Sequence, residues 1–365
     1  MSTSEVLLEA RHQHHVFAVK SSTGLSNVVQ NLLRPKMQTI EGLEPEDSNH
    51  VHLPSQPSQQ LINNKYGKRK ENISYGHSGI ISLSQRTDNT GKSHFYATRK
   101  YQRRVEESSR AYRKRVTTAF CISSCLRHHN VLSPLELFQN KDGTFCEVSP
   151  FCVGGDLEAL IFQARKLGSQ EADCYFKQLV QGVDYLHSSG VAHQDLNPKS
   201  LLLTENGVLK ITNFRFADCF RQSWEAEDQM KRSSTRSGSI HYIAPEVFVE
   251  KKFDPRPVDM WAVGLLYMTM RTGKLLWRFA AEGGDEHYDK YLGDRKALWG
   301  YRPIENLRNE HCRTVMQSLL DPSPTARLTA AQVLGSLWCL EMELCDAARS
   351  EFASSSETSQ SPNTV

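Results

Sequence analysis

The pattern of apolar and polar positions divides this chain of 365 residues into four stretches. Residues 1–62 are rich in Ser, Gln, Asn and His and show little sustained periodicity, which predicts a disordered segment. Between 63 and 151, short apolar runs alternate with turn residues, as is typical of a β-rich unit. From 154 to 345, most apolar residues recur at helical spacing. Residues 346–365 are polar and Ser-rich, which predicts a disordered tail.

The individual elements follow from the local spacing of apolar residues and from turn signals. The expected strands cover residues 74–83, 94–101 and 145–151, and the expected helices cover residues 110–126, 157–167, 172–188, 258–271, 312–320 and 330–344. Strands come first and helices follow, so the sequence predicts an α+β fold with a small β-rich lobe and a large helical lobe.

Composition narrows the class of protein. Hydrophobic residues make up 39% of the chain, and Lys plus Arg number 44 against 41 Asp plus Glu, which argues against a nucleic-acid partner. The nine Cys form no CxxC pair and no secretory signal is apparent, so we expect a reducing, cytoplasmic compartment. Cys121 and Cys125 are expected to pack in the core. No run of about 18 apolar residues occurs, so no transmembrane segment is predicted.

The stretch from His193 to Arg215, HQDLNPKSLLLTENGVLKITNFR, carries the strongest chemical signal. It resembles the protein-kinase motifs HRDLKPEN and DFG at the expected separation. Among the residues that match the family are His193, Asp195 and Phe214. The family has Arg, Lys, Asn, Asp and Gly where this chain has Gln194, Asn197, Ser200, Asn213 and Arg215. The resemblance implies that Asp195 holds the position of the catalytic base.

Three further residues match positions that shape the kinase fold. Ala244-Pro245-Glu246 matches the APE motif, and the resemblance implies a buried ion pair between Glu246 and Arg327. Asp259 falls where the family hydrogen-bonds the backbone of the catalytic loop. The resemblance implies a bilobal protein-kinase fold over residues 63–345, with an N-lobe at 63–149, a hinge at 150–153 and a C-lobe at 154–345.

Several longer segments narrow the resemblance: CLRHHNVLSPLEL, DCFRQSWE, WRFAAEGGDEHYDKYL and WGYRPIENL. They are similar to segments of the fungal halotolerance and nitrogen-permease-reactivator kinases over about residues 65–340. That family implies Ser/Thr phosphorylation of protein substrates and regulation of plasma-membrane transporters from the cytoplasm. Ser239 lies where Ser/Thr-specific kinases place a hydroxyl beside the catalytic Asp.

The same resemblance implies an ATP site. The segment 74–81 resembles the Gly-rich loop, in which glycines permit close approach of the backbone. The residues assigned to the nucleotide are Gly76 and Gly79 in this loop, Ile81, Ala97 and Leu202 around the purine, and the Pro150 carbonyl and Cys152 amide at the hinge.

The groups that would handle Mg²⁺ and the γ-phosphate are altered. Arg99 stands at the position of the phosphate-binding Lys, and Ala119 at that of its Glu partner. Ser200 and Asn213 each offer one neutral oxygen, whereas Mg²⁺ prefers anionic oxygens, so we do not predict a metal site. Two interpretations of Arg99 and Arg215 stay open. Either they replace the metal as counter-charges for nucleotide binding, or they lie in solvent or pair with local carboxylates.

These observations predict a pseudokinase that works through protein partners and binds ATP without transferring phosphate. The alternatives are a weak Ser/Thr kinase, with Asp195 as base and Arg99 on the phosphates, and a degenerate copy without function. Basic residues cluster between 92 and 115, and two interpretations of them stay open. They form a surface that docks an acidic partner or associates peripherally with an anionic membrane, or they are a solvated helix face.

Overall fold

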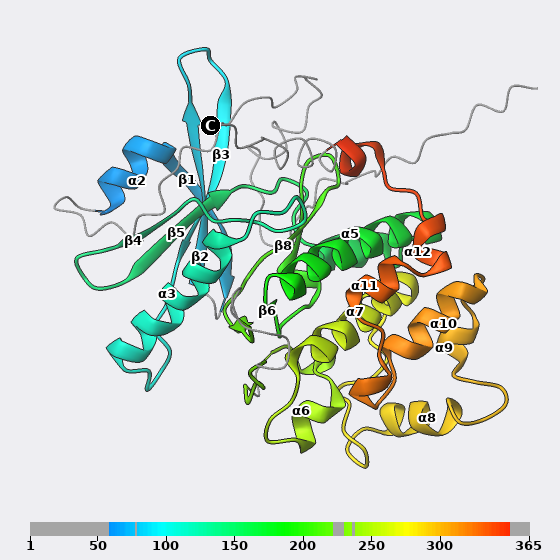
Figure 1. Ribbon diagram of the computed structural model, residues 1–365. Helices are drawn as coiled ribbons and strands as arrows, with labels where there is room; N and C mark the ends of the chain where they lie inside the picture. Colours follow the sequence, from blue (N-terminus) through cyan, green and yellow to red (C-terminus); the bar gives the residue numbers. More distant parts are fainter. Residues whose placement is uncertain (1–57, 77–78, 222–229, 236–237, 351–365) are drawn as a thin grey trace, which may run out of the picture.

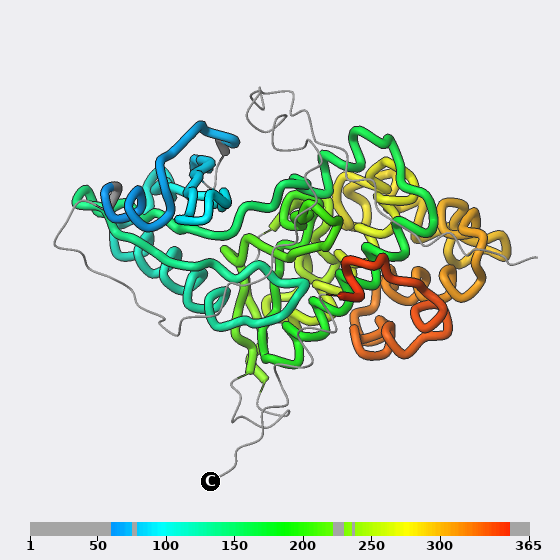
Figure 2. The backbone as a smooth tube through the Cα atoms, turned by 90° about the horizontal axis from the view of Figure 1, so that it is seen from above, coloured from blue at the N-terminus to red at the C-terminus, as the bar shows by residue number. Residues whose placement is uncertain are grey.

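The computed structural model describes residues 58–76, 79–221, 230–235 and 238–350. They form two lobes (Figure 1), and the predicted α+β, bilobal fold is confirmed. Figure 2 shows the blue-to-cyan part of the first lobe at one end of the molecule and the orange-to-red part of the second lobe toward the other.

The N-lobe is a five-stranded antiparallel sheet with the strand order β1-β2-β3-β5-β4. Asp88 closes the turn between β2 and β3, because its carboxylate accepts hydrogen bonds from the backbone N–H of Thr90 and Lys92 at 2.9 and 3.0 Å. The elements of this lobe are α2 (Ser58–Tyr66), β1 (Lys68–Gly76), β2 (Gly79–Thr87), β3 (Ser93–Lys100), α3 (Ser109–Cys125), β4 (Glu136–Gln139) and β5 (Phe145–Pro150).

The predicted strand 74–83 corresponds to two strands, since it contains the connection between β1 and β2. Most of β1 was not expected because its sequence, KRKENISYG, is polar and it lies at the edge of the sheet. Gly79 has a φ of 121°, and a Cβ at this position would lie 2.0 Å from the carbonyl oxygen of Lys100. The close approach of β2 to β3 therefore requires this glycine.

The helix α2 extends the folded unit to Ser58, so the predicted disorder is wrong for residues 58–62. Ile62 and Tyr66 are buried against the face of the sheet opposite to α3. The Tyr66 hydroxyl donates to Oε2 of Glu136 at 2.6 Å, on β4. A mostly polar helix is thus fixed by two apolar residues one turn apart. Residues 1–57 lie outside the described residues, and their disorder stays a prediction.

The helix α3 packs on the opposite face of the sheet through Tyr112, Val116 and Phe120, which recur at helical spacing. Cys121 and Cys125 fall on the other side of the helix and are exposed, so their predicted core packing is wrong. Among the residues that the structure describes, no group of three or more His, Cys, Asp or Glu side chains is arranged to hold a metal ion.

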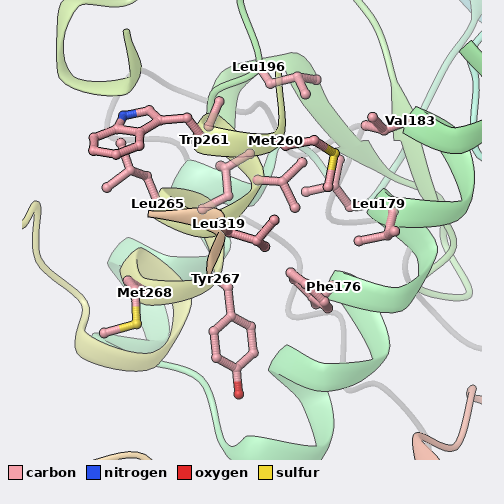
Figure 3. Packing of buried hydrophobic residues seen from close by; sticks show 14 of the residues in the cluster. Phe176, Leu179, Val183, Leu196, Met260, Trp261, Leu265, Tyr267, Met268 and Leu319 are labelled. Atoms are coloured by element: carbon pink, nitrogen blue, oxygen red, sulfur yellow. The ribbon is translucent and has the colours of Figure 1, made fainter. Parts of the chain in front are cut away.

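The C-lobe is built around α5 and α7, whose apolar side chains interdigitate (Figure 3). Phe176 on α5 and Trp261 on α7 are completely buried there. Within the described residues, no helix is both long and apolar enough to cross a membrane. The elements are α4 (Leu157–Ala164), α5 (Ser169–Ser188), β6 (Val191–Ala192), η1 (Pro198–Ser200), β7 (Leu201–Leu203), β8 (Leu209–Ile211), β9 (Asp218–Cys219), η3 (Ile240–Tyr242), α6 (Pro245–Val249), α7 (Pro255–Thr272), α8 (Glu286–Asp294), α9 (Arg302–Glu305), α10 (Glu310–Leu319), η4 (Pro324–Ala326), α11 (Ala330–Leu334) and α12 (Leu337–Glu341).

The end of the folded unit differs from the prediction in two ways. The predicted helix 330–344 is split into α11 and α12, because the Ser336 side chain caps a new helix by accepting from the backbone N–H of Cys339. The predicted domain end at 345 is too early, since Ala348 is buried in a cluster with Cys174 of α5. Residues 351–365 lie outside the described residues.

The connection from α3 to β4 is anchored in the C-lobe by Asn130, which is completely buried. The side-chain Nδ2 of Asn130 donates to the main-chain carbonyl of Leu209 at 3.0 Å. The main-chain carbonyl of Asn130 accepts from the backbone N–H of Ile211 at 2.7 Å. The position of α3 is therefore tied to β8, the strand that leads into Asn213.

We expect His128, in the same connection, to make the fold sensitive to acid. Its ring stacks on Tyr185 of α5 with centroids 4.9 Å apart. Burial, together with the charges of His129 and Lys210, lowers its pKa from 6.5 to about 3. Between these values the unfolded chain binds the proton more tightly, so stability is lost as the pH falls from about 6.5 toward 3. Thermal unfolding measured across this range should show that loss.

The control for this prediction is His128→Asn, because an Asn oxygen can accept the hydrogen bond that the His128 ring accepts from the backbone N–H of Asn130. The variant should lose part of the acid sensitivity, whereas His311→Asn at an exposed position should not. Equal pH profiles for the wild type and His128→Asn would contradict the prediction.

Candidate active site

The loop between β6 and η1 is shaped by the buried carboxylate of Asp259 on α7. This carboxylate accepts hydrogen bonds from the backbone N–H groups of His193 and Gln194, both at 2.8 Å, and lies 3.0 Å from Nε2 of His187. Gln194 has a φ of 58°, an unusual conformation for a non-glycine residue. The interaction expected of Asp259 is therefore present, and it holds the backbone next to Asp195.

The side chains of Asn197 and Ser200 form a capping box around η1. The Ser200 hydroxyl accepts from the backbone N–H of Asn197 at 3.0 Å and lies 2.9 Å from the carbonyl oxygen of the same residue. Asn197 in turn accepts from the backbone N–H of Lys199 at 3.0 Å. Ser200 is completely buried, so its hydroxyl serves the local backbone instead of pointing toward a ligand.

The carboxylate of Asp195 is surrounded by donors. Arg215 donates to Oδ2 from Nε and Nη2 at 3.2 and 3.0 Å. Ser239 donates to Oδ1 from its backbone N–H and its hydroxyl at 2.8 and 2.9 Å, and Nδ2 of Asn197 adds a contact to Oδ1 at 3.1 Å. An ionised carboxylate has about four lone-pair sites, and these five contacts occupy them. Asp195 is also 3% exposed, so a substrate hydroxyl would have to displace a partner.

The segment from Thr212 to Arg215 lies directly against this loop. Nε2 of His193 lies 2.9 Å from the carbonyl oxygen of Thr212, and the ring of His193 meets that of Phe214 edge to face at 5.1 Å. Asn213 has a φ of 71°, which Asn tolerates, and its buried Oδ1 has no hydrogen-bond partner among the described residues. One neutral oxygen is therefore available at the position of the family's anionic ligand.

Arg99, on β3, lies beside Tyr101 and Glu147. Glu147 is the register partner of Arg99 on β5, and its charge acts on the Arg99 guanidinium, which lies 5.9 Å from the centre of the Tyr101 ring. The Tyr101 hydroxyl donates to Oε2 of Glu147 at 2.8 Å, and burial followed by the Glu147 charge raises the pKa of Tyr101, so it stays protonated. Ala119 faces the same small cavity, of about 20 Å³, where it offers no charge. Arg99 and Arg215 both have carboxylate neighbours, as in the second of the two interpretations.

The residues assigned to the purine come from both lobes. Ile81, Ala97 and Leu202 are partly buried on β2, β3 and β7, while Cys152 is buried and Pro150 exposed at the hinge. Gly76 ends β1 opposite Gly79, and His77 and Ser78 lie outside the described residues. The role of all these residues toward a nucleotide stays a proposal.

The pair of Glu246 and Arg327 is present and buried. Nη1 and Nη2 of Arg327 donate to the two carboxylate oxygens at 2.7 and 2.8 Å, and the side chains are 3% and 0% exposed. The guanidinium also lies over the ring of Trp261 at 4.8 Å. This pair joins α6 to the segment before α11.

The fold agrees with the comparison to known proteins. The sequence model of the protein kinase domain family matches residues 68–339. The chain belongs to the protein kinase family. It is 49% identical over 285 residues to the serine/threonine-protein kinase hal4 of Schizosaccharomyces pombe, a match covering 78% of this chain and 44% of that protein. It is 42% identical over 322 residues to the serine/threonine-protein kinase HAL4/SAT4 of Saccharomyces cerevisiae, covering 86% and 53%.

A third relative, the probable serine/threonine-protein kinase HAL5-like of Eremothecium gossypii, is 32% identical over 372 residues, covering 90% of this chain and 54% of that protein. The chain thus spans about half the length of the relatives that it matches. The resemblance to fungal halotolerance kinases is confirmed at the level of the family.

The described part of the activation segment, the stretch between Asn213 and Glu246, is held through neutral groups. The buried hydroxyl of Ser233 donates to Oε1 of Gln194 at 2.8 Å, and Nε2 of Gln194 donates to the carbonyl of Phe216 at 3.2 Å. Ser233 also exchanges backbone hydrogen bonds with Phe253. Gln194 carries no charge, unlike the family's Arg at this position, and nothing in the sequence marks Ser233 among the neighbouring hydroxyls.

The basic surface predicted between 92 and 115 is present in part. Arg99 is partly buried, and Arg115 pairs with Glu107, whose carboxylate lies 2.7 Å from Nε of Arg115. The exposed basic residues of this surface are Lys100, Arg103, Arg104, Arg110, Arg113 and Lys114.

Proposed function

We propose that this kinase-family chain is a pseudokinase, a regulatory or scaffold module that acts through protein partners and does not transfer phosphate. The observation that carries the proposal is the occupied carboxylate of Asp195, with Arg215 on one oxygen and Ser239 on the other. A general base needs a free lone pair within hydrogen-bond reach of the proton that it accepts. In this chain Arg215 replaces a Gly of the kinase family, and its guanidinium occupies the lone pairs on Oδ2 of Asp195.

The residues in the metal-binding positions do not fit Mg²⁺. The Ser200 hydroxyl is engaged with the backbone of Asn197, and Asn213 offers one neutral oxygen. Mg²⁺ needs hard, preferably anionic oxygens in octahedral geometry. We therefore propose that any nucleotide binds without Mg²⁺, through the apolar residues Ile81, Ala97 and Leu202.

The first test is phosphotransfer from labelled ATP to a generic basic protein, with Asp195→Ala as the control. Loss of one pre-organised charge-stabilising group typically lowers turnover about 100- to 1000-fold, and several are altered here. We expect the wild type and Asp195→Ala to incorporate the same background label. Incorporation that Asp195→Ala abolishes would overturn the proposal and favour the second candidate.

The second test is thermal unfolding with ATP in the presence of Mg²⁺ or EDTA. A ligand that binds the folded state raises the melting temperature according to its concentration and affinity. We expect ATP to give equal shifts with Mg²⁺ and with EDTA, and Leu202→Asp, in the purine position, to abolish both shifts. A shift that requires Mg²⁺, or none in either buffer, counts against metal-independent ATP binding.

The second candidate is a weak Ser/Thr protein kinase with Asp195 as base. It is favoured by the Ser239 hydroxyl, which lies 2.9 Å from Oδ1 of Asp195, as the resemblance to Ser/Thr kinases implies. The names of the relatives support the same specificity. Three further parts belong to the proposal. The family resemblance supports regulation of plasma-membrane transporters and a cytoplasmic location. The positive charge of the basic surface near α3 supports peripheral membrane association.

A further inference from the structure

The loop between α8 and α9 is a turn closed by its own backbone hydrogen bonds. They run from Lys296 N–H to the Gly293 carbonyl at 3.2 Å and from Gly300 N–H to the Ala297 carbonyl at 3.1 Å. Arg295 ties it to the body of the C-lobe through Asp321 at 2.6 Å. Tyr301, which follows the turn, is buried edge to face on Tyr291.

Two large apolar side chains stand at the tip of this turn without a packing role. Leu298 is 106% exposed and Trp299 is 71% exposed, whereas Trp261, Trp277 and Trp338 are at most 3% exposed. A scattered exposed Leu is ordinary, but an adjacent Leu and Trp on a fixed protrusion form an unpartnered apolar surface. The turn is held by its backbone hydrogen bonds, by the pair of Arg295 and Asp321, and by the buried Tyr301, so these two side chains are not needed for its shape.

The exposed charges around the tip are positive. Lys296 precedes Leu298, and Arg302 follows Trp299, both exposed. The nearest carboxylates are partnered, since Asp294 lies 3.1 Å from Nζ of Lys290 and Glu305 accepts from Gln317. A Leu-Trp tip flanked by Lys and Arg combines apolar insertion with attraction to negative charge.

We propose that Leu298 and Trp299 insert into the interfacial region of an anionic lipid bilayer, with Lys296 and Arg302 at the headgroups. The tip is convex, and a bilayer accommodates a protruding side chain, whereas a protein partner would have to supply a matching pocket. Trp is favoured at the headgroup level, where its ring is buried and its N–H stays hydrated. The surface is independent of Asp195, so the proposal stands whether or not the domain transfers phosphate.

The experiment measures binding of the full chain to vesicles of phosphatidylcholine with roughly one third phosphatidylserine, by co-sedimentation, beside pure phosphatidylcholine vesicles. We expect binding to the anionic vesicles that weakens with added salt. The double variant Leu298→Ser with Trp299→Ser should lower the affinity about tenfold or more, and Lys296→Ser about fivefold. Both should keep the wild-type melting temperature, because these side chains are exposed.

A fluorescence measurement locates the contact. In a Trp224→Phe background, which removes the tryptophan that lies outside the described residues, Trp299 is the exposed indole, and its emission should shift to shorter wavelength on anionic vesicles. Trp299→Phe should remove the shift while retaining most of the binding, because Phe keeps an aromatic ring there.

Matched controls assign the surface. Val105→Ser, at another exposed apolar residue, and the triple variant Arg110→Ser, Arg113→Ser and Lys114→Ser, in the basic surface near α3, should each keep the Trp299 shift. The absence of binding to anionic vesicles would overturn the proposal and leave a protein partner for this tip. Binding that the Leu298 and Trp299 variant retains but the α3 variant loses would overturn it in favour of the basic surface.

Discussion

Replacing Arg327 with Ala is expected to lower the free energy of unfolding by about 3 to 5 kcal/mol. The guanidinium satisfies two oxygens of Glu246 and the backbone carbonyls of Asp321, Pro257 and Pro322, so each of its five N–H groups has an acceptor. Its removal leaves the Glu246 carboxylate buried without a counter-charge. Urea denaturation followed by circular dichroism measures the change.

Two controls separate burial from charge in this prediction. Arg349→Ala removes an ion pair with Asp346 whose side chains are half exposed, and should change stability much less than Arg327→Ala. The double variant Glu246→Gln with Arg327→Met should recover part of the loss, because no charge is then stranded. If Arg327→Ala cost no more than Arg349→Ala, the pair would not be the stabilising link between α6 and the segment before α11.

Replacing Ile62 with Ala is expected to cost about 2 to 5 kcal/mol, the range for a fully buried aliphatic side chain. Ile62 is 1% exposed although it lies ahead of the matched kinase domain, which begins at residue 68. It packs with Tyr66 and Tyr96 on the face of the sheet that α3 does not cover. The same denaturation measurement applies.

The matched control for Ile62→Ala is Val105→Ala, since Val105 is 94% exposed and should change stability by less than about 0.5 kcal/mol. A chain that starts at Lys68 should be destabilised at least as strongly as Ile62→Ala, because it loses the whole of α2. Wild-type stability in that shortened chain would show that α2 is an appendage and that the domain starts at β1.

The helical lobe and its scaffold could be predicted from sequence because their signals are redundant. The helical periodicity of apolar residues in α5 and α7 predicts the same fold as the spacing between Asp195, Glu246 and Asp259 along the chain. Several independent patterns therefore lead to one fold. By contrast, α2 has a polar composition, and two buried residues, Ile62 and Tyr66, decide its position. Periodicity over one turn carries too little information to separate such a helix from a polar linker.

The contacts of the charged residues could not be predicted in the same way. Arg215 lies beyond the β7–β8 hairpin that follows Asp195, and its position in the sequence was consistent with a nucleotide phosphate, with solvent or with a local carboxylate. The choice depends on where the chain turns after Asn213, at a φ of 71°, which composition does not encode. For Arg99 the decisive neighbour is Glu147, which is adjacent only through the pairing of β3 with β5.

The hydrogen bond from Ser233 to Gln194 determines what an upstream signalling enzyme could do to this domain. The activation segment is already docked by an unmodified hydroxyl that is 2% exposed. A phosphate on that oxygen would remove the donor and place about two negative charges against a neutral amide that supplies no counter-charge. We therefore expect modification at Ser233 to release the segment from Gln194.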